Sequence, residues 1–144
     1  MRFFSMQLGL AALMCGAAVS SGQQTPMDAA TAMATGGLNG NWKNVDARTR
    51  GLVRIVVDGT KVHPYGACSP VACDWGVIAG QAFASKVDLR DMSSLLVSDS
   101  QGFVRRVMTV SIEPDGRLRV QVFNHYTDNS HRADSSFVDY FVRQ

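Results

Sequence analysis

Short segments in which apolar and polar residues alternate fill the chain from Leu38 onward, and glycine-containing turns separate them. Residues 53–57 alternate in this way and end at Asp58-Gly59, the dipeptide most typical of a tight β-hairpin. Residues 104–112 and 117–122 repeat the pattern around Pro114-Asp115-Gly116. Because successive side chains of a strand point to opposite faces, each segment can present one face to a core and the other to solvent. The pattern predicts antiparallel strands joined by short turns.

Six further segments of this kind are expected to form strands, at 41–45, 60–65, 73–78, 82–87, 93–98 and 137–143. The total is then about eight or nine short strands, and no long amphipathic helix interrupts them. A sheet of this size removes its exposed edges by closing on itself or by stacking as two sheets. We therefore predict an all-β fold, a small antiparallel up-and-down β-barrel of about eight strands, with a β-sandwich as the alternative.

The first residues have the features of an export signal. Arg2 supplies a positive charge, an apolar stretch runs from Leu8 to Val19, and small residues stand at Ala18 and Ser20. We expect residues 1–20 to be a signal peptide, residues 21–37 a flexible tether and residues 38–144 the barrel domain, in a periplasmic or secreted protein. Cys15 suggests a lipoprotein as the less favoured alternative, because Met14 stands where lipidation requires a small residue.

The composition excludes several classes of protein. Hydrophobic residues make up 46% of the chain and charged residues 18%, which supports a packed core and argues against disorder. The formal net charge of +2 gives no basic face for nucleic acid or an anionic membrane. After residue 20 no apolar run is long enough to span a bilayer, so we expect neither a nucleic-acid partner nor a membrane span.

Cys68 and Cys73 are the two cysteines that remain after removal of a signal peptide. In an exported chain this C-x4-C pair is most simply a disulfide, which would contribute about 2 kcal/mol by closing so short a loop. Zinc is a weaker alternative, because only His63 and Asp74 lie near as further ligands. A catalytic dithiol is weaker still, since redox motifs place two residues between the cysteines.

The first expected strand opens with Gly40-Asn41-Trp42, and this G-x-W resembles the start of lipocalin and avidin barrels. The resemblance implies that Trp42 plugs one end of the barrel while a basic residue of the last strand lies on it. Arg143 ends the last expected strand, and a guanidinium stacked on an indole is a favourable cation–π pair. We expect Trp42 and Arg143 to close the barrel.

A longer resemblance extends over the expected barrel domain. It rests on Gly40-x-Trp42-x-Asn44-x-Asp46, Arg50-Gly51 with Arg54, Val62-His63-x-Tyr65-Gly66-x-Cys68-x-Pro70-x-x-Cys73-Asp74-Trp75-Gly76, Arg117-Leu118-x-Val120 and Phe137-x-x-x-Phe141. In these motifs the chain resembles a family of uncharacterised exported bacterial proteins. Relatives often carry His and Asp inside the Cys loop, where this chain has Ser69 and Ala72. The resemblance implies no activity.

The segments that flank the Cys loop carry the richest chemistry. His63, Tyr65, Asp74 and Trp75 combine aromatic contact area with polar groups that give direction, and a disulfide would make the loop rigid. We predict that these four residues form a site that binds a ligand or a partner. The alternative is that Tyr65 and Trp75 serve only in core or rim packing.

A second candidate site is the polar loop between the last two expected strands, residues 124–132. His125, Asp128 and His131 can in principle bind a divalent metal weakly, but Asp128 to Ser130 is also ordinary turn chemistry. We therefore predict no metal site, no cofactor and a turn as the main role of this loop.

No motif of a nucleophile, a metalloprotease or a phosphate-binding loop is present, and Glu113 is the only glutamate. We expect a protein that is not an enzyme. The favoured function is an exported binding module that recognises a small ligand or a macromolecule through the barrel mouth and the Cys loop. The alternative is a periplasmic inhibitor or immunity-type protein that blocks a secreted enzyme, with an envelope protein as partner.

Overall fold

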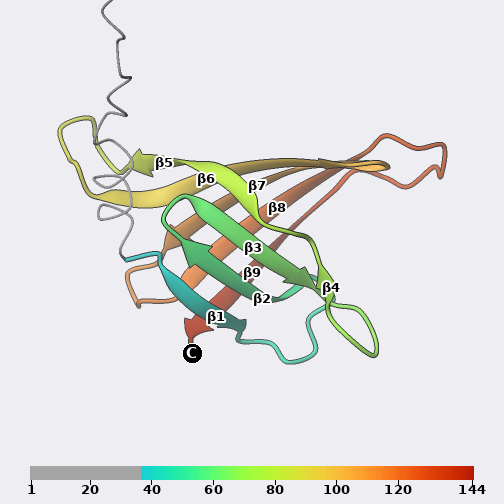
Figure 1. Cartoon of the computed structure of the whole chain (residues 1–144), viewed down its shortest axis with the longest axis horizontal. Helices are drawn as coiled ribbons and strands as arrows, with labels where there is room; N and C mark the ends of the chain where they lie inside the picture. The colour runs from blue at the N-terminus through green and yellow to red at the C-terminus, as the bar shows by residue number, and fades with distance from the viewer. Residues whose placement is uncertain (1–36) are drawn as a thin grey trace, which may run out of the picture.

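The computed structural model describes residues 37–144, and these residues form nine β-strands and no helix (Figure 1). Within this part of the chain no helix is long and apolar enough to cross a membrane. The predicted signal peptide at 1–20 and all of the predicted tether at 21–37 except Gly37 lie outside the described residues.

The strands follow one another along the chain with short connections. They are β1 (Gly40–Asn44), β2 (Leu52–Asp58), β3 (Lys61–Gly66), β4 (Cys73–Asp74), β5 (Ile78–Ala84), β6 (Met92–Gln101), β7 (Val104–Ile112), β8 (Leu118–Tyr126) and β9 (Ser135–Arg143).

Eight of the strands close into a ring. Each of them pairs antiparallel with the next one along the chain, and β3 pairs directly with β5. The ring closes where β9 pairs with β1, with Trp42 opposite Arg143. The two-residue β4 pairs only with the end of β3. The predicted up-and-down barrel is therefore confirmed, and the β-sandwich is excluded.

The two turn signatures stand where the sequence predicts hairpins. Asp58 pairs with Lys61 across the first turn, where Gly59 has a φ of 58°. Gly116, with a φ of 83°, lies in the turn between β7 and β8. Both glycines adopt the left-handed conformation that other residues enter only with strain.

The region from 73 to 87 differs from the prediction. The strand expected at 73–78 stops after Asp74, and the strand expected at 82–87 instead runs from Ile78 to Ala84. Residues 75–77 leave the sheet at this point, where Gly76 adopts a φ of 79°. The alternation of apolar and polar residues cannot indicate such an interruption, because the interruption depends on where the side chain of Trp75 packs.

The alternating strand directions divide the connections between two ends of the barrel. One end, here called the open end, carries the connections 45–51, 67–77, 102–103 and 127–134. The other, the closed end, carries the connections 59–60, 85–91 and 113–117, together with the start of β1 and the end of β9. In Figure 1 the Cys loop and the loop between β8 and β9 project from the same side of the barrel. The Cys loop and the second candidate loop thus lie at one end.

The barrel is filled with side chains up to its open end. Fully buried residues include Trp42, Ile55, Met108, Val120 and Phe141, each at most 1% exposed. At the closed end the Trp42 indole N–H donates to the carbonyl oxygen of Leu38 at 2.8 Å. The Arg143 guanidinium lies over the indole, 4.3 Å from the ring centroid. The predicted closure of the barrel by Trp42 and Arg143 is confirmed.

Candidate functional site

The Cys loop is closed by a disulfide. Cys68 and Cys73 are bonded, with their Cα atoms 5.4 Å apart, as the sequence predicts. Cys73 pairs with Gly66 in the short ladder between β3 and β4, so the loop projects from the open end of the barrel. The backbone N–H of Ala67 donates to the carbonyl oxygen of Gly51 at 2.8 Å, which ties the Cys loop to the neighbouring β1–β2 loop.

The four residues predicted to form one contact surface are divided between two places. His63, Tyr65 and Asp74 lie on the outer wall of the barrel. His63 Nε2 is 2.5 Å from Asp74 Oδ1, and the Tyr65 hydroxyl is 3.2 Å from His63 Nδ1. The rings of His63 and Tyr65 stack with centroids 4.4 Å apart, and the Arg54 guanidinium covers Tyr65 at 3.8 Å. This chain of contacts fixes β4 against β3.

Asp74 accepts two hydrogen bonds in the outer-wall cluster. The hydrogen bond from His63 lowers the pKa of Asp74 below its ordinary value near 3.8, and the backbone N–H of Gly76 lowers it further. Hydrogen bonds to a carboxylate favour its charged form. The Asp74 carboxylate therefore holds both the His63 ring and the backbone of residues 75–77, which follow β4.

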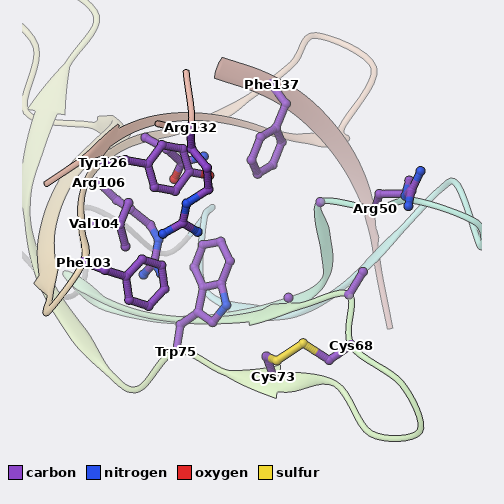
Figure 2. A pocket seen from close by; sticks show the side chains of 14 residues that line it. Arg50, Cys68, Cys73, Trp75, Phe103, Val104, Arg106, Tyr126, Arg132 and Phe137 are labelled. Atoms are coloured by element: carbon purple, nitrogen blue, oxygen red, sulfur yellow. A yellow bond between two sulfur atoms is a disulfide. The ribbon is translucent and has the colours of Figure 1, made fainter. Parts of the chain in front are cut away.

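Trp75 leaves this cluster and turns into the open end of the barrel (Figure 2). Its backbone N–H still donates to the Pro64 carbonyl oxygen at 3.1 Å, so the backbone stays beside β3. Gly66 makes room for the ring, since a Cβ at this position would lie 2.7 Å from the indole Nε1. The indole thus lies flat against a strand that carries no side chain at that point.

A buried arginine holds the other face of the indole. Arg106 is only 7% exposed, and its guanidinium lies 4.1 Å from the centre of the Trp75 ring. It donates to Asp99 at 2.9 Å and to Gln101 at 3.4 Å. The Gln101 side-chain amide in turn donates to the Trp75 carbonyl oxygen at 2.9 Å. Strands β6 and β7 therefore fix both the ring and the backbone of Trp75.

Arg132 holds the loop between β8 and β9 in a similar way. Its guanidinium lies 4.2 Å from the ring centre of Tyr126 and 4.8 Å from that of Phe103. It also donates to Asp128 at 2.6 Å and to the Ser130 hydroxyl at 2.7 Å. The loop is thereby folded over Tyr126, at the end of β8, and over Phe103, in the turn between β6 and β7.

Asp139 positions the third loop of the open end, between β1 and β2. Its carboxylate accepts hydrogen bonds from the Thr49 hydroxyl at 3.0 Å and from the Leu52 backbone N–H at 2.7 Å. Arg50 stands between these two residues. Its backbone is fixed, while its side chain is exposed.

These loops surround a pocket of about 230 Å³ at the mouth of the barrel, called here the mouth pocket (Figure 2). Tyr126 and Phe137 stand on one side of it, and Phe103 and Trp75 stand opposite. Three arginines, Arg50, Arg106 and Arg132, also line it, together with the disulfide. The pocket thus combines four aromatic rings with three guanidinium groups.

The histidines of the second candidate loop lie outside the mouth pocket. His125 pairs with Asp134 at 2.8 Å, and Asp128 is engaged by Ser130 and Arg132 rather than by a histidine. His131 is exposed, with a φ of 57°. Among residues 37–144 no group of three or more His, Cys, Asp or Glu side chains is arranged to hold a metal ion.

Most residues of the mouth pocket are not among the predicted contacts, although the sequence carries a signal for Arg106. Arg106 stands in register with Val104 and Met108, on the inward face of β7. A charged residue at an apolar position indicates a buried ion pair, and Asp99 occupies the matching position of β6. Phe103, Arg132 and Phe137 gave no comparable signal, because their proximity depends on how the loops fold back.

Comparisons with protein-family models, with curated proteins and with solved structures found no match to this chain. The resemblances to an exported bacterial family and to lipocalin and avidin barrels therefore remain predictions.

Proposed function

We propose that this protein is a binding module that takes a small ligand, or the end group of a larger one, into the mouth pocket. The supporting observation is the convergence of Trp75, Phe103, Tyr126 and Phe137 around one hollow at the end of a filled barrel. Ligand sites are typically concave, largely apolar and supplied with a few polar groups that set orientation. The mouth pocket is a hollow with aromatic walls and three guanidinium groups that can set orientation.

The size of the hollow limits the ligand. Its volume of about 230 Å³ is below the roughly 300–1,000 Å³ of pockets for drug-sized molecules. Side chains such as Leu52, Val122 and Phe141 fill the barrel and are fully buried. The proposed ligand is therefore a group of one or two rings that enters from the open end and does not reach the centre of the barrel.

The disulfide supports a location in an oxidising compartment outside the cytoplasm. Structural disulfides persist in secreted and periplasmic proteins and are rare in reducing compartments. We therefore place the binding module in the periplasm or among secreted proteins, in agreement with the signal peptide predicted at 1–20.

The two tryptophans of the chain provide a direct test. In a ¹⁵N-labelled sample of the full chain, the neutral probe 2-naphthamide should shift the indole N–H signal of Trp75 and leave that of Trp42 in place. Trp75→Ala and Phe137→Ala should each weaken binding at least fivefold, because anchoring residues of this type typically contribute more than about 1 kcal/mol. Arg117→Ala, at the closed end, is the control and should bind normally. Equal shifts at both indoles, or a shift at Trp42 alone, would contradict the proposal.

A second function is favoured by one observation on the Cys loop. Val71 is 76% exposed at the tip of the disulfide-closed loop, where an apolar side chain gains nothing from the fold. An inhibitor that inserts this loop into the active site of a secreted enzyme would use such a residue. Inhibition of a secreted protease or glycosidase by the protein, abolished by Val71→Asp while 2-naphthamide still binds, would establish this function as separate from the first.

A further inference from the structure

We propose that the mouth pocket selects aromatic carboxylates over neutral aromatic compounds of the same shape. This inference rests on the proposed binding function and specifies the class of ligand. It starts from the charges around the pocket: Arg50, Arg106 and Arg132 line it, and no aspartate or glutamate does. Three positively charged side chains and no carboxylate therefore border the position of a ligand.

Arg106 provides the best-ordered of these charges. It is 7% exposed and held by Asp99, which lies outside the pocket lining, so the negative charge that balances Arg106 is on its far side from the ligand. A guanidinium has five N–H donors, and Asp99 and Gln101 are the two side chains to which this one donates. Burial makes its field stronger than that of a solvated arginine.

Arg132 adds a second guanidinium at the rim. Its side chain is 43% exposed and donates through Nε to Ser130 and through Nη2 to Asp128. The remaining terminal nitrogen makes no side-chain hydrogen bond within residues 37–144. Its stacking on Tyr126 holds the group beside an aromatic wall of the pocket.

Arg50 differs from the other two because no carboxylate balances it. It forms no ion pair in the described part of the chain, and it lines the rim of the pocket, at the right of Figure 2, where its side chain is turned away from the four aromatic rings. The hydrogen bonds of Asp139 fix the backbone on both sides of it, while its long side chain remains exposed. An arginine of this kind is suited to pair with an incoming carboxylate through two parallel N–H···O bonds.

The aromatic side chains determine the rest of the ligand. A flat ring can lie between Trp75 and Phe137, which stand on opposite sides of the hollow in Figure 2. The volume of about 230 Å³ accommodates one fused ring pair and excludes a long acyl chain. The complement of the mouth pocket is therefore a planar ring system with a carboxylate at its edge, near Arg50.

The experiment compares 2-naphthoate with 2-naphthamide, which share shape and ring system and differ in charge. We expect the full chain to bind 2-naphthoate about tenfold more tightly by isothermal calorimetry at low salt, because charge-assisted hydrogen bonds are about twice as strong as neutral ones. Arg50→Gln should reduce this ratio to about threefold or less, because it should weaken 2-naphthoate binding much more than 2-naphthamide binding. Arg48→Gln is the matched control, since Arg48 is exposed on the same loop but does not line the pocket. Acetate, which has the charge without the ring, should bind at least tenfold more weakly than 2-naphthoate.

The outcomes separate this inference from the proposed function. If both naphthyl compounds shift the Trp75 indole signal and bind equally, carboxylate selectivity is wrong and the binding function stands. If neither compound shifts that signal, the binding function itself is wrong. If selectivity is present but falls equally in Arg50→Gln and Arg48→Gln, general surface charge and not the mouth pocket is responsible. Full selectivity in Arg50→Gln would show that Arg50 does not pair with the carboxylate.

Discussion

The protein uses a tryptophan stacked with an arginine at each end of its barrel, and the two pairs are built in opposite ways. At the closed end the indole of Trp42 is buried, with 1% exposure, and the covering Arg143 is exposed. At the open end Arg106 is the buried partner, and Trp75 remains partly exposed. The distances from guanidinium to ring centre, 4.3 and 4.1 Å, are nearly equal. The two pairs therefore differ in which partner is buried, the tryptophan at the closed end and the arginine at the open end.

This exchange separates a structural plug from the wall of a pocket. A buried indole with its N–H bonded to Leu38 contributes apolar burial, while Arg143 donates to the carbonyl oxygens of Gly37 and Asn39 in contact with solvent. A buried guanidinium must instead be compensated by Asp99, and buried ion pairs often contribute little net stability. The open-end pair is better explained by its effect on the shape and charge of the mouth pocket than by stabilisation of the fold.

The largest expected difference between the two ends is in stability. Trp42→Ala should lower the free energy of unfolding by about 3–5 kcal/mol, as is typical for loss of a fully buried large aromatic side chain. Trp75→Ala should cost clearly less, about 1–2 kcal/mol, because part of that ring already contacts water. Urea unfolding of both variants, followed by circular dichroism, measures the difference. Equal losses would show that Trp75 is also a core residue.

The second prediction concerns the buried charge that only the open end contains. Asp99→Asn should destabilise the protein by about 2–4 kcal/mol, because it leaves Arg106 buried without a counter-charge. The double variant Asp99→Leu with Arg106→Met should recover most of this loss, since well-packed apolar residues often replace a buried ion pair at little cost. A double variant as unstable as Asp99→Asn would mean that the ion pair itself stabilises the barrel.

The third prediction sharpens the role of the exposed partner at the closed end. Arg143→Ala should lower the free energy of unfolding by about 0.5–2 kcal/mol, the range of a cation–π contact. Arg143→Lys should recover only part of it, because an ammonium cannot donate to two carbonyl oxygens from a planar fork. Thermal unfolding of the two variants beside wild type provides the measurement. An effect as large as that of Trp42→Ala would contradict the assignment of the indole as the main plug.

The smallest expected effect is a change of pKa with only a slight loss of stability. The pKa of Asp74 is lowered first by His63, at the open end, whereas the pKa of Asp115 is lowered by Arg117, at the closed end. His63→Phe keeps a ring against Tyr65 but removes the hydrogen bond, so the pKa of Asp74 should rise toward 3.8. It should not reach that value, because the Gly76 N–H still donates to the carboxylate.

The sign of the stability effect follows from the direction of this shift. A carboxylate with a lowered folded-state pKa contributes stability that is complete above its unfolded pKa and is lost as pH falls through the folded pKa. His63→Phe should therefore make the protein slightly less stable at neutral pH and unchanged at a pH below both pKa values. Carboxyl ¹³C NMR titration follows both groups, and Asp115 is the control. An equal rise in the pKa of Asp115 would indicate a global change and not the loss of one hydrogen bond.

The fold could be predicted from sequence because its determinants are local. Asp58-Gly59 and Pro114-Asp115-Gly116 fix two hairpins, and the alternation of β7 and β8 fixes which side chains face inward. The pairing of Trp42 with Arg143 also follows, since closing the barrel brings the first and last strands together. Each of these inferences depends on neighbours in the chain or on closure alone.

The site was only half predictable because it depends on one break in the alternation. Asp74 and Trp75 are adjacent in sequence and were expected on one surface, but the link after β4 sends the first to the outer wall and the second into the barrel. That turn requires the bare backbone of Gly66 on the neighbouring strand, which no local pattern reveals. Loop contacts such as Arg132 on Tyr126 depend on the tertiary structure in the same way.

The pairing of β1 with β9 also determines how the molecule can be presented to its surroundings. Since β1 begins and β9 ends at the closed end, both ends of the described chain lie on the side opposite the mouth pocket. A fusion partner, a surface linker or an immobilising tag joined at either end of the described barrel therefore starts on the side away from the ligand entrance. The backbone N–H of Gln144 donates to Asn41 at 2.9 Å, which brings the two termini of the barrel within reach of a short peptide. A circular permutant that joins these two termini and is opened in the loop at 85–91 would leave the loops around the mouth pocket uncut, because no residue of 85–91 lines that pocket.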